Sequence, residues 1–237
     1  MTGPALSKRE LNATRTRHKL VDAAVALYGS RSIDAVSLRE IGAAAGQKNP
    51  NVLQYHFGDR DGLLQAIVDR HAGAISQLRE RYIERASRGE WPPGEAAARC
   101  LVMPIIDYVE AEPDGINYVK IVSQIAAVYQ SGAAPTGEAA IRFPNNERLV
   151  EVFNRALTAI PHREAQRRIY LVVTNTFHSI ADIYRAAAHQ PAGSPVASKR
   201  PMVQQLILLL DSFFSAPSNA AAGESGNRPS GKSPARE

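Results

Sequence analysis

Cysteines and long apolar runs are scarce in this sequence, and each scarcity excludes a class of protein. The 237 residues include one cysteine, Cys100, so the chain cannot form an internal disulfide or a cysteine metal cluster. The run LILLL at 206–210 is far shorter than the ~20 apolar residues of a membrane-spanning helix. The N-terminus also has no apolar signal segment, so we expect a cytoplasmic protein with no membrane partner.

The sequence also lacks the common catalytic signatures. It contains no G-x-S-x-G, no G-x-G-x-x-G, no P-loop and no H-E-x-x-H motif. We therefore expect no enzymatic activity, no cofactor and no bound metal. The apolar fraction of 44% and the charged fraction of 22% are typical of a globular protein.

The most informative stretch begins at Ser37 and reads SLREIGAAAGQKNPNVLQYHFGDRD. Ser37 and Glu40 have the S-x-x-E spacing of a capping box that starts a short helix. Gly46 suits the left-handed position at the end of that helix. Asn49 can cap a second helix at 50–57, whose first residue is a proline. Two short helices joined by a tight turn predict a helix-turn-helix.

Residues 16–64 resemble the DNA-binding domain of TetR-type repressors. The resemblance is carried by LVDAAVALYGSRSIDAVSLREIGAAAG, by QYHFG and by DRDGLL. Ten residues separate Gly46 from Phe57, one more than in the common form of the family, so the turn or the start of the recognition helix is longer. The resemblance implies an all-helical regulator that binds double-stranded operator DNA.

Polar side chains of this stretch are the candidate DNA contacts. The second helix offers amide and hydroxyl groups to base edges or phosphates, and the resemblance implies a phosphate contact for the residue at position 60. The predicted DNA-binding residues are Ser37, Arg39, Gln47, Lys48, Asn49, Asn51, Gln54, Tyr55, His56 and Arg60.

The distribution of charge agrees with this assignment. Residues 1–58 carry eight Lys or Arg and four Asp or Glu, whereas residues 59–215 carry seventeen of each. A basic head on a neutral body favours phosphate binding through the head.

Helical periodicity predicts an all-α protein of about nine helices. We expect a flexible basic arm at 1–12, a three-helix helix-turn-helix head at 13–58 and a larger helical effector and dimerisation domain at 59–215. The Ser-, Gly-, Pro- and Ala-rich segment 216–237 is expected to be a disordered tail because it has too few large apolar residues to form a core.

The predicted last helix, 199–214, is apolar on more than one side. Such a helix at the end of a domain needs two partners, and we expect the second to be another copy of the chain in a two-fold homodimer. The alternative is a fully buried helix in a monomer. The predicted dimer-interface residues are Met202, Leu206, Leu209 and Phe213.

The resemblance also implies an unknown small-molecule effector in the helical body. An apolar cavity with a few polar groups would suit it; alternatively, the same side chains simply pack the core. The predicted ligand-binding residues are Met103, Tyr108, Tyr118, Ile121, Gln124, Ile125, Phe153, Phe177 and His178. We expect a repressor released from its operator by the effector. Two alternatives are an enzyme with a vestigial DNA-binding head and a DNA-binding protein without an effector.

Overall fold

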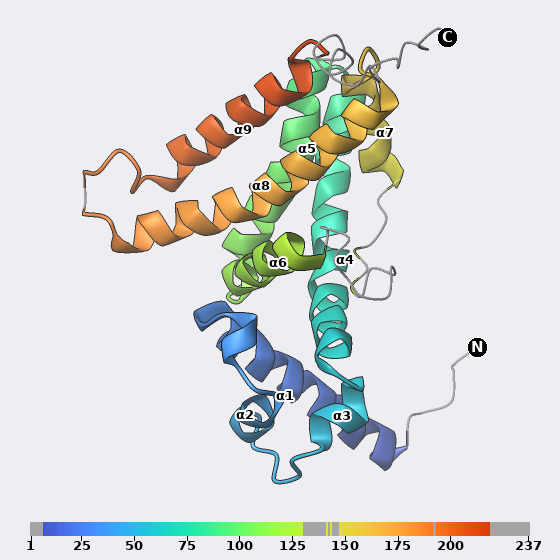
Figure 1. Ribbon diagram of the computed structural model, residues 1–237, viewed down its shortest axis with the longest axis vertical. Coiled ribbons are helices and arrows are strands. Elements are labelled where there is room, and N and C mark those ends of the chain that lie inside the picture. Colours follow the sequence, from blue (N-terminus) through green and yellow to red (C-terminus); the bar gives the residue numbers. More distant parts are fainter. Residues whose placement is uncertain (1–6, 130–140, 142, 144–146, 192, 219–237) are drawn as a thin grey trace, which may run out of the picture.

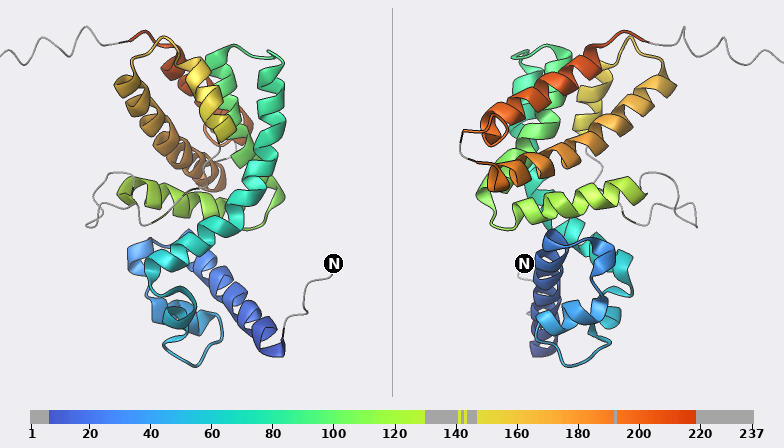
Figure 2. Two further views of the ribbon diagram at one scale, coloured as in Figure 1. Left: turned by 90° about the vertical axis from the view of Figure 1, so that its right-hand side faces the viewer. Right: turned by 60° about the vertical axis from the view of Figure 1, so that its left-hand side comes forward.

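The computed structural model describes residues 7–129, 141, 143, 147–191 and 193–218, and within them the chain is entirely helical. A small head and a larger body lie at opposite ends of the molecule (Figures 1 and 2). The head contains α1 (Lys8–Ser30), the 3-10 turn η1 (Ile33–Ala35), α2 (Leu38–Ala44) and α3 (Val52–Phe57). The body contains α4 (Arg60–Ser87), α5 (Pro93–Ala111), α6 (Gly115–Tyr129), α7 (Glu147–Ala156), α8 (His162–His189) and α9 (Lys199–Ser215).

Helix α1 begins five residues before the predicted start at 13. The Ser7 hydroxyl accepts from the Glu10 N–H at 3.3 Å, and the Glu10 carboxylate accepts from the Ser7 N–H at 2.7 Å. This reciprocal capping box stabilises a helix start inside the segment that was expected to be a flexible arm. Residues 1–6 of that predicted arm, and the predicted tail from 219 onward, lie outside the described residues.

Helix α4 joins the two parts of the molecule. The Asp59 carboxylate accepts from the Gly62 N–H at 2.8 Å and caps the start of the helix. Its 28 residues correspond to a length of about 42 Å. The N-terminal part packs against α1 and α3, and the remainder packs against α5, α6 and α7. A displacement of α4 in the body therefore moves the head.

The body is built around α5, which packs against α4, α7 and α9. Helix α6 crosses beneath it and packs against α8 on one side and α1 of the head on the other (Figure 2). As its composition predicts, α6 is buried on several sides, and its buried apolar residues are Tyr118, Val119, Ile121, Val122, Ile125 and Ala126. The head thus rests on a helix that is itself fixed in the core.

Helix α9 buries one side against α5 and α8 and leaves another side exposed. The buried residues are Val203, Leu206, Ile207, Leu210 and Phe214. On the other side, Leu208, Leu209 and Phe213 are 56%, 61% and 37% exposed. Of the predicted interface residues, Leu206 therefore faces its own protomer and Met202 is half-buried, whereas Leu209 and Phe213 are at the surface.

Within the described residues, no helix is both long enough and apolar enough to cross a membrane. In the same part of the chain, no group of three or more His, Cys, Asp or Glu side chains is arranged to hold a metal ion.

Candidate nucleic-acid interface and the cavity behind it

Helix α2 begins at the predicted cap. The Ser37 hydroxyl accepts from the Glu40 N–H at 3.2 Å. The Glu40 carboxylate does not complete the reciprocal pair but accepts from the Arg31 guanidinium at 2.5 Å. Half of the predicted capping box is present, and its acidic member instead ties α2 to the end of α1. In this cap the Ser37 hydroxyl is an acceptor, so its O–H remains a donor for a phosphate.

The turn between α2 and α3 is held by its own side chains. Gly46 has a φ of +72°, the left-handed conformation that the sequence predicts and that favours glycine. The Gln47 side chain donates to the carbonyl of Ala45 at 3.2 Å, and the Asn49 carboxamide accepts from the Asn51 N–H at 3.0 Å. Gln47 and Asn49 therefore shape the turn, and α3 starts two residues later than predicted.

Helix α3 presents a polar surface at the end of the molecule remote from the body (Figure 2). Val52 and Leu53 are buried and anchor the helix on the head. Gln54 is exposed, Tyr55 is 75% exposed and His56 is half-buried. The helix therefore offers an amide and a phenol to a DNA groove from a short, anchored scaffold.

Arg17 of α1 completes this surface and was not among the predicted contacts. Its guanidinium lies over the Phe57 ring, 4.5 Å from the ring centroid. Burial, and then the positive charge of Arg17, lower the pKa of His56. At neutral pH His56 is therefore an uncharged hydrogen-bonding group. This contact joins two helices that are far apart in the sequence, so helical periodicity could not show it.

Arg60, predicted to contact a phosphate, is hydrogen-bonded within the head. Its guanidinium donates to the carbonyls of Ile33 and Val36 at 2.6 and 3.1 Å. These bonds fix the start of α4 to the segment that precedes α2, and they use two of the five N–H donors of the guanidinium. Arg60 therefore has a structural role in the head, and its contact with a phosphate stays a prediction. Arg39, Lys48 and Asn51, by contrast, are exposed.

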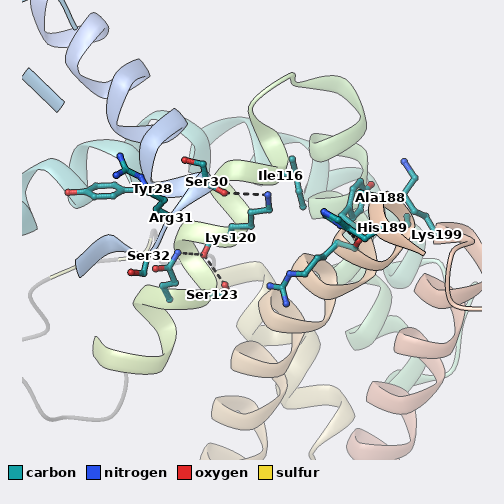
Figure 3. A pocket seen from close by; sticks show the side chains of 15 residues that line it. Tyr28, Ser30, Arg31, Ser32, Ile116, Lys120, Ser123, Ala188, His189 and Lys199 are labelled. Carbon is teal, nitrogen blue, oxygen red and sulfur yellow. Dashed lines mark hydrogen bonds between the residues drawn. The ribbon is translucent and has the colours of Figure 1, made fainter. Parts of the chain in front are cut away.

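A cavity of about 810 Å³ lies where the head meets the body (Figure 3). Its size is within the usual range of small-molecule sites. Its walls come from the end of α1 with the following turn, from α6, from the end of α8 and from the first residue of α9. The lining residues are Tyr28, Gly29, Ser30, Arg31, Ser32, Ile116, Lys120, Ser123, Gln124, Tyr184, Arg185, Ala187, Ala188, His189 and Lys199.

Direct bonds between head and body border this cavity. The Gln124 side chain of α6 accepts from the Ile33 N–H at 2.9 Å, and Lys120 donates to the Gly29 carbonyl at 3.3 Å. At Gly29 the two helices approach so closely that an added Cβ would lie 2.4 Å from the Asn117 side chain. The head is therefore held on α6 by close packing as well as by hydrogen bonds.

Most of the predicted ligand-binding residues lie outside the lining of this cavity. Gln124 lines the cavity, and the other predicted residues do not. Tyr108, Tyr118, Ile121, Ile125 and Phe153 are buried in the body core. Met103 and Phe177 are half-buried, and His178 is on the exposed surface of α8.

Several cavity residues were not predicted, although one had a visible signal. Lys120 is the single charged residue in the sequence of α6, GINYVKIVSQIAAVY. A lone cation on an otherwise apolar helix needs a polar destination, and here it reaches the end of α1. Lys199 and His189 had no such signal, because they are at helix ends in a polar connection.

A helix-turn-helix head with an exposed polar second helix, joined to a larger helical body, is the architecture of a DNA-binding transcriptional regulator. Residues 20–67 match the family model described as "Bacterial regulatory proteins, tetR family". Residues 20–67 therefore form a DNA-binding domain of the TetR-family type.

Two solved structures align with most of the chain. A TetR-family regulator from Streptomyces coelicolor is 18% identical with a TM-score of 0.44, and the alignment covers 91% of this chain and 100% of that one. A protein described as a TetR-family transcriptional regulator from Mesorhizobium loti is 17% identical with a TM-score of 0.44, and the alignment covers 86% of this chain and 96% of that one. No curated protein matches the sequence.

We expect Gln54→Ala to relax the preference for one base pair in each half-site. An exposed amide in the recognition helix can pair with adenine, and losing such a contact costs ~1–3 kcal/mol on the preferred sequence. Competition binding with preferred and randomised DNA measures the effect. Gln77→Ala, at an exposed position of α4 in the body, is the matched control. Equal loss of affinity for both DNAs would contradict the base contact.

Proposed function

We propose that this protein is a homodimeric repressor that a small-molecule effector releases from its operator DNA. The observation that carries this proposal is the junction between head and body. There, Gln124 accepts from the Ile33 N–H at 2.9 Å beside a cavity large enough for a ligand. A ligand at this point can alter the position of the DNA-binding head without touching DNA.

The polar face of α3 supports sequence-specific DNA binding. Gln54 and Tyr55 are exposed on a helix whose other side is anchored by Val52 and Leu53. In this proposal Gln54 reads a base edge, while Tyr55, Arg39 and Lys48 bind the phosphate backbone. Phosphate contacts position the head, and the base contact supplies the sequence preference.

The exposed apolar side chains of α8 and α9 support a homodimer. Leu208, Leu209 and Phe213 on α9 are 37–61% exposed, and Tyr170 and Leu171 on α8 are 38% and 44% exposed. Exposed apolar surface of this kind marks an association site. A two-fold pairing of these helices would give two heads, and heads ~34 Å apart match successive major grooves.

Release follows if the effector prefers the DNA-free arrangement of head and body. A ligand shifts an equilibrium only by its difference in affinity for the two states. The coupling is reciprocal and typically ~1–3 kcal/mol, so bound effector weakens operator binding by the factor with which operator weakens effector binding.

An operator selection tests this proposal. Purified full-length protein is incubated with a random DNA library, and bound DNA is amplified through several rounds. We expect enrichment of a palindromic site with two half-sites, and release of that site when a metabolite extract is added. If no sequence is enriched, the protein is not a sequence-specific regulator. If a site is enriched but the extract never releases it, a DNA-binding protein without an effector is favoured.

A further inference from the structure

We propose that the cavity between head and body binds a small organic carboxylate, held by Lys120 and Lys199. Its binding would favour one arrangement of the head on the body. The effect on operator DNA rests on the proposed function, whereas the binding itself can be measured without DNA.

The cavity lining is strongly unbalanced in charge. It contains Arg31, Lys120, Arg185 and Lys199 and no Asp or Glu. Two of these cations have partners outside the lining. Arg31 pairs with Glu40 at 2.5 Å. Arg185 pairs with Asp182 on the exposed surface of α8 at 2.9 Å. The two lysines have no carboxylate within 4.0 Å in the described part of the chain.

Helix ends reduce the excess charge but do not remove it. Helices α1 and α8 both end at this cavity, and each C-terminal end has the effect of about half a negative charge. The bond from Lys120 to the Gly29 carbonyl is one expression of this attraction. Helix α9 begins at the cavity with Lys199, and its N-terminal end adds about half a positive charge. Four cations, two carboxylate partners, about one negative unit from α1 and α8 and about half a positive unit from α9 leave an excess of between about one and two positive charges. A ligand with one negative charge would neutralise most of this excess.

Both lysines keep hydrogen-bond donors for a ligand. An ammonium group has three donors, and Lys120 uses one of them on Gly29. The Lys199 ammonium lies over the Tyr184 ring, 4.7 Å from its centroid, a contact that leaves its donors available. The Tyr184 hydroxyl is buried without a hydrogen-bond partner among the described residues. Burial raises the pKa of Tyr184 to about 12, so the phenol remains protonated at neutral pH.

The wall between the two lysines is apolar, which indicates the rest of the ligand. In the view of Figure 3, Ile116 and Ala188 lie between the side chains of Lys120 and Lys199. Ala187 also contributes to the lining. A carboxylate on an apolar body would meet the charged groups and this wall together, whereas inorganic anions would leave the wall in contact with water.

The position of the cavity links such binding to the head. Residues 29–32 form its head side, and α6, α8 and α9 form its body side. Any ligand that contacts both sides stabilises one relative arrangement. Lys120 would contribute both to ligand binding and to the attachment of the head, because it lines the cavity and also bonds to the Gly29 carbonyl. Lys199 belongs to the cavity alone, so it gives the cleaner test.

The experiment measures the melting temperature of the full-length protein with two carboxylates, benzoate and octanoate, and with their uncharged amides. Ionic strength is kept constant with chloride. We expect the carboxylate to raise the melting temperature and the amide to leave it unchanged, because only the former is attracted to the lysines. Lys199→Met should weaken the apparent affinity at least tenfold, and the double variant with Lys120→Met should abolish the shift.

Arg200→Met is the matched control, since Arg200 is adjacent on α9 and does not line the cavity. It should respond as the wild type does. The inference is overturned if neither carboxylate shifts the melting temperature more than its amide, or if the lysine variants respond fully. The single Lys199→Met variant keeps the test valid even if loss of the Lys120 bond prevents folding.

Operator binding separates this inference from the proposed function. If the variants lose the carboxylate response while carboxylate never affects the operator affinity of the wild type, the anion site stands and the proposed release mechanism fails. If operator is bound and released by a metabolite extract but no carboxylate-specific shift exists, the repressor proposal stands and the anion site is rejected.

Discussion

Leu209→Arg should convert the proposed dimer into folded monomers and weaken operator binding by ~10²–10⁴-fold, the usual gain from linking two binding modules. Leu209 is 61% exposed on α9, and Phe213 lies one turn further on the same side. In a two-fold interface each substituted residue meets the same apolar surface of the partner. Burying an unpaired guanidinium there costs several kcal/mol, more than a modest interface can supply.

Sedimentation and far-ultraviolet circular dichroism, at one fixed protein concentration, separate dissociation from unfolding. The helix content should stay constant because Leu209 makes little contact within its own protomer. Val150→Arg is the matched control, since Val150 is 44% exposed on α7 and outside the proposed interface. An intact dimer in the Leu209 variant would place the association surface elsewhere.

The all-α architecture and the helix-turn-helix were predicted well because helix starts and ends depend on local signals. The Ser37 cap and the glycine at position 46 have the predicted conformations, and each acts within one helical turn. The start of α1 was missed although Ser7 and Glu10 have the spacing of a capping box. There the polar composition of the first residues suggested a flexible arm, and a local cap prevailed.

The site was harder to predict because it depends on which faces meet. An apolar stripe shows that a residue points inward, but not whether another side chain or an empty space lies opposite. Tyr118 and Ile125 therefore fitted a ligand pocket and a core equally well, and both are buried in the core. Leu206 and Leu209 posed the same problem on α9, where the packing of α5 and α8 buries the former and exposes the latter.

The second large effect concerns acid stability and one buried histidine. His71 on α4 is 4% exposed, bonds through Nδ1 to the Tyr108 hydroxyl and stacks on Tyr118 with ring centroids 4.6 Å apart. Its Nε2 has no partner among the described residues. Burial, followed by the charge of Arg70, lowers the pKa of His71 to about 4. The folded protein therefore holds this imidazole neutral in its core.

The lowered pKa makes the folded state sensitive to acid. The unfolded chain protonates His71 near pH 6.5, while the folded chain does so only near pH 4. Between these values the unfolded state binds more protons, so stability falls as the pH falls. The full loss, reached below about pH 4, is about 3 kcal/mol. Above pH 6.5 this group gives no pH dependence.

His71→Gln removes the titrating group and should flatten the stability profile between pH 6.5 and pH 4. Urea unfolding at fixed protein concentration gives the free energy of unfolding at each pH in this range. The quantity compared is the slope of this free energy against pH, because a change in packing that is the same at every pH does not alter the slope. His162→Gln, at an exposed position at the start of α8, should retain the slope of the wild type. Protonation of carboxylates also destabilises the protein in acid, but it does so equally in the wild type and in both variants. Parallel profiles for the wild type and the His71 variant would therefore mean that His71 is protonated in the folded core at an ordinary pH.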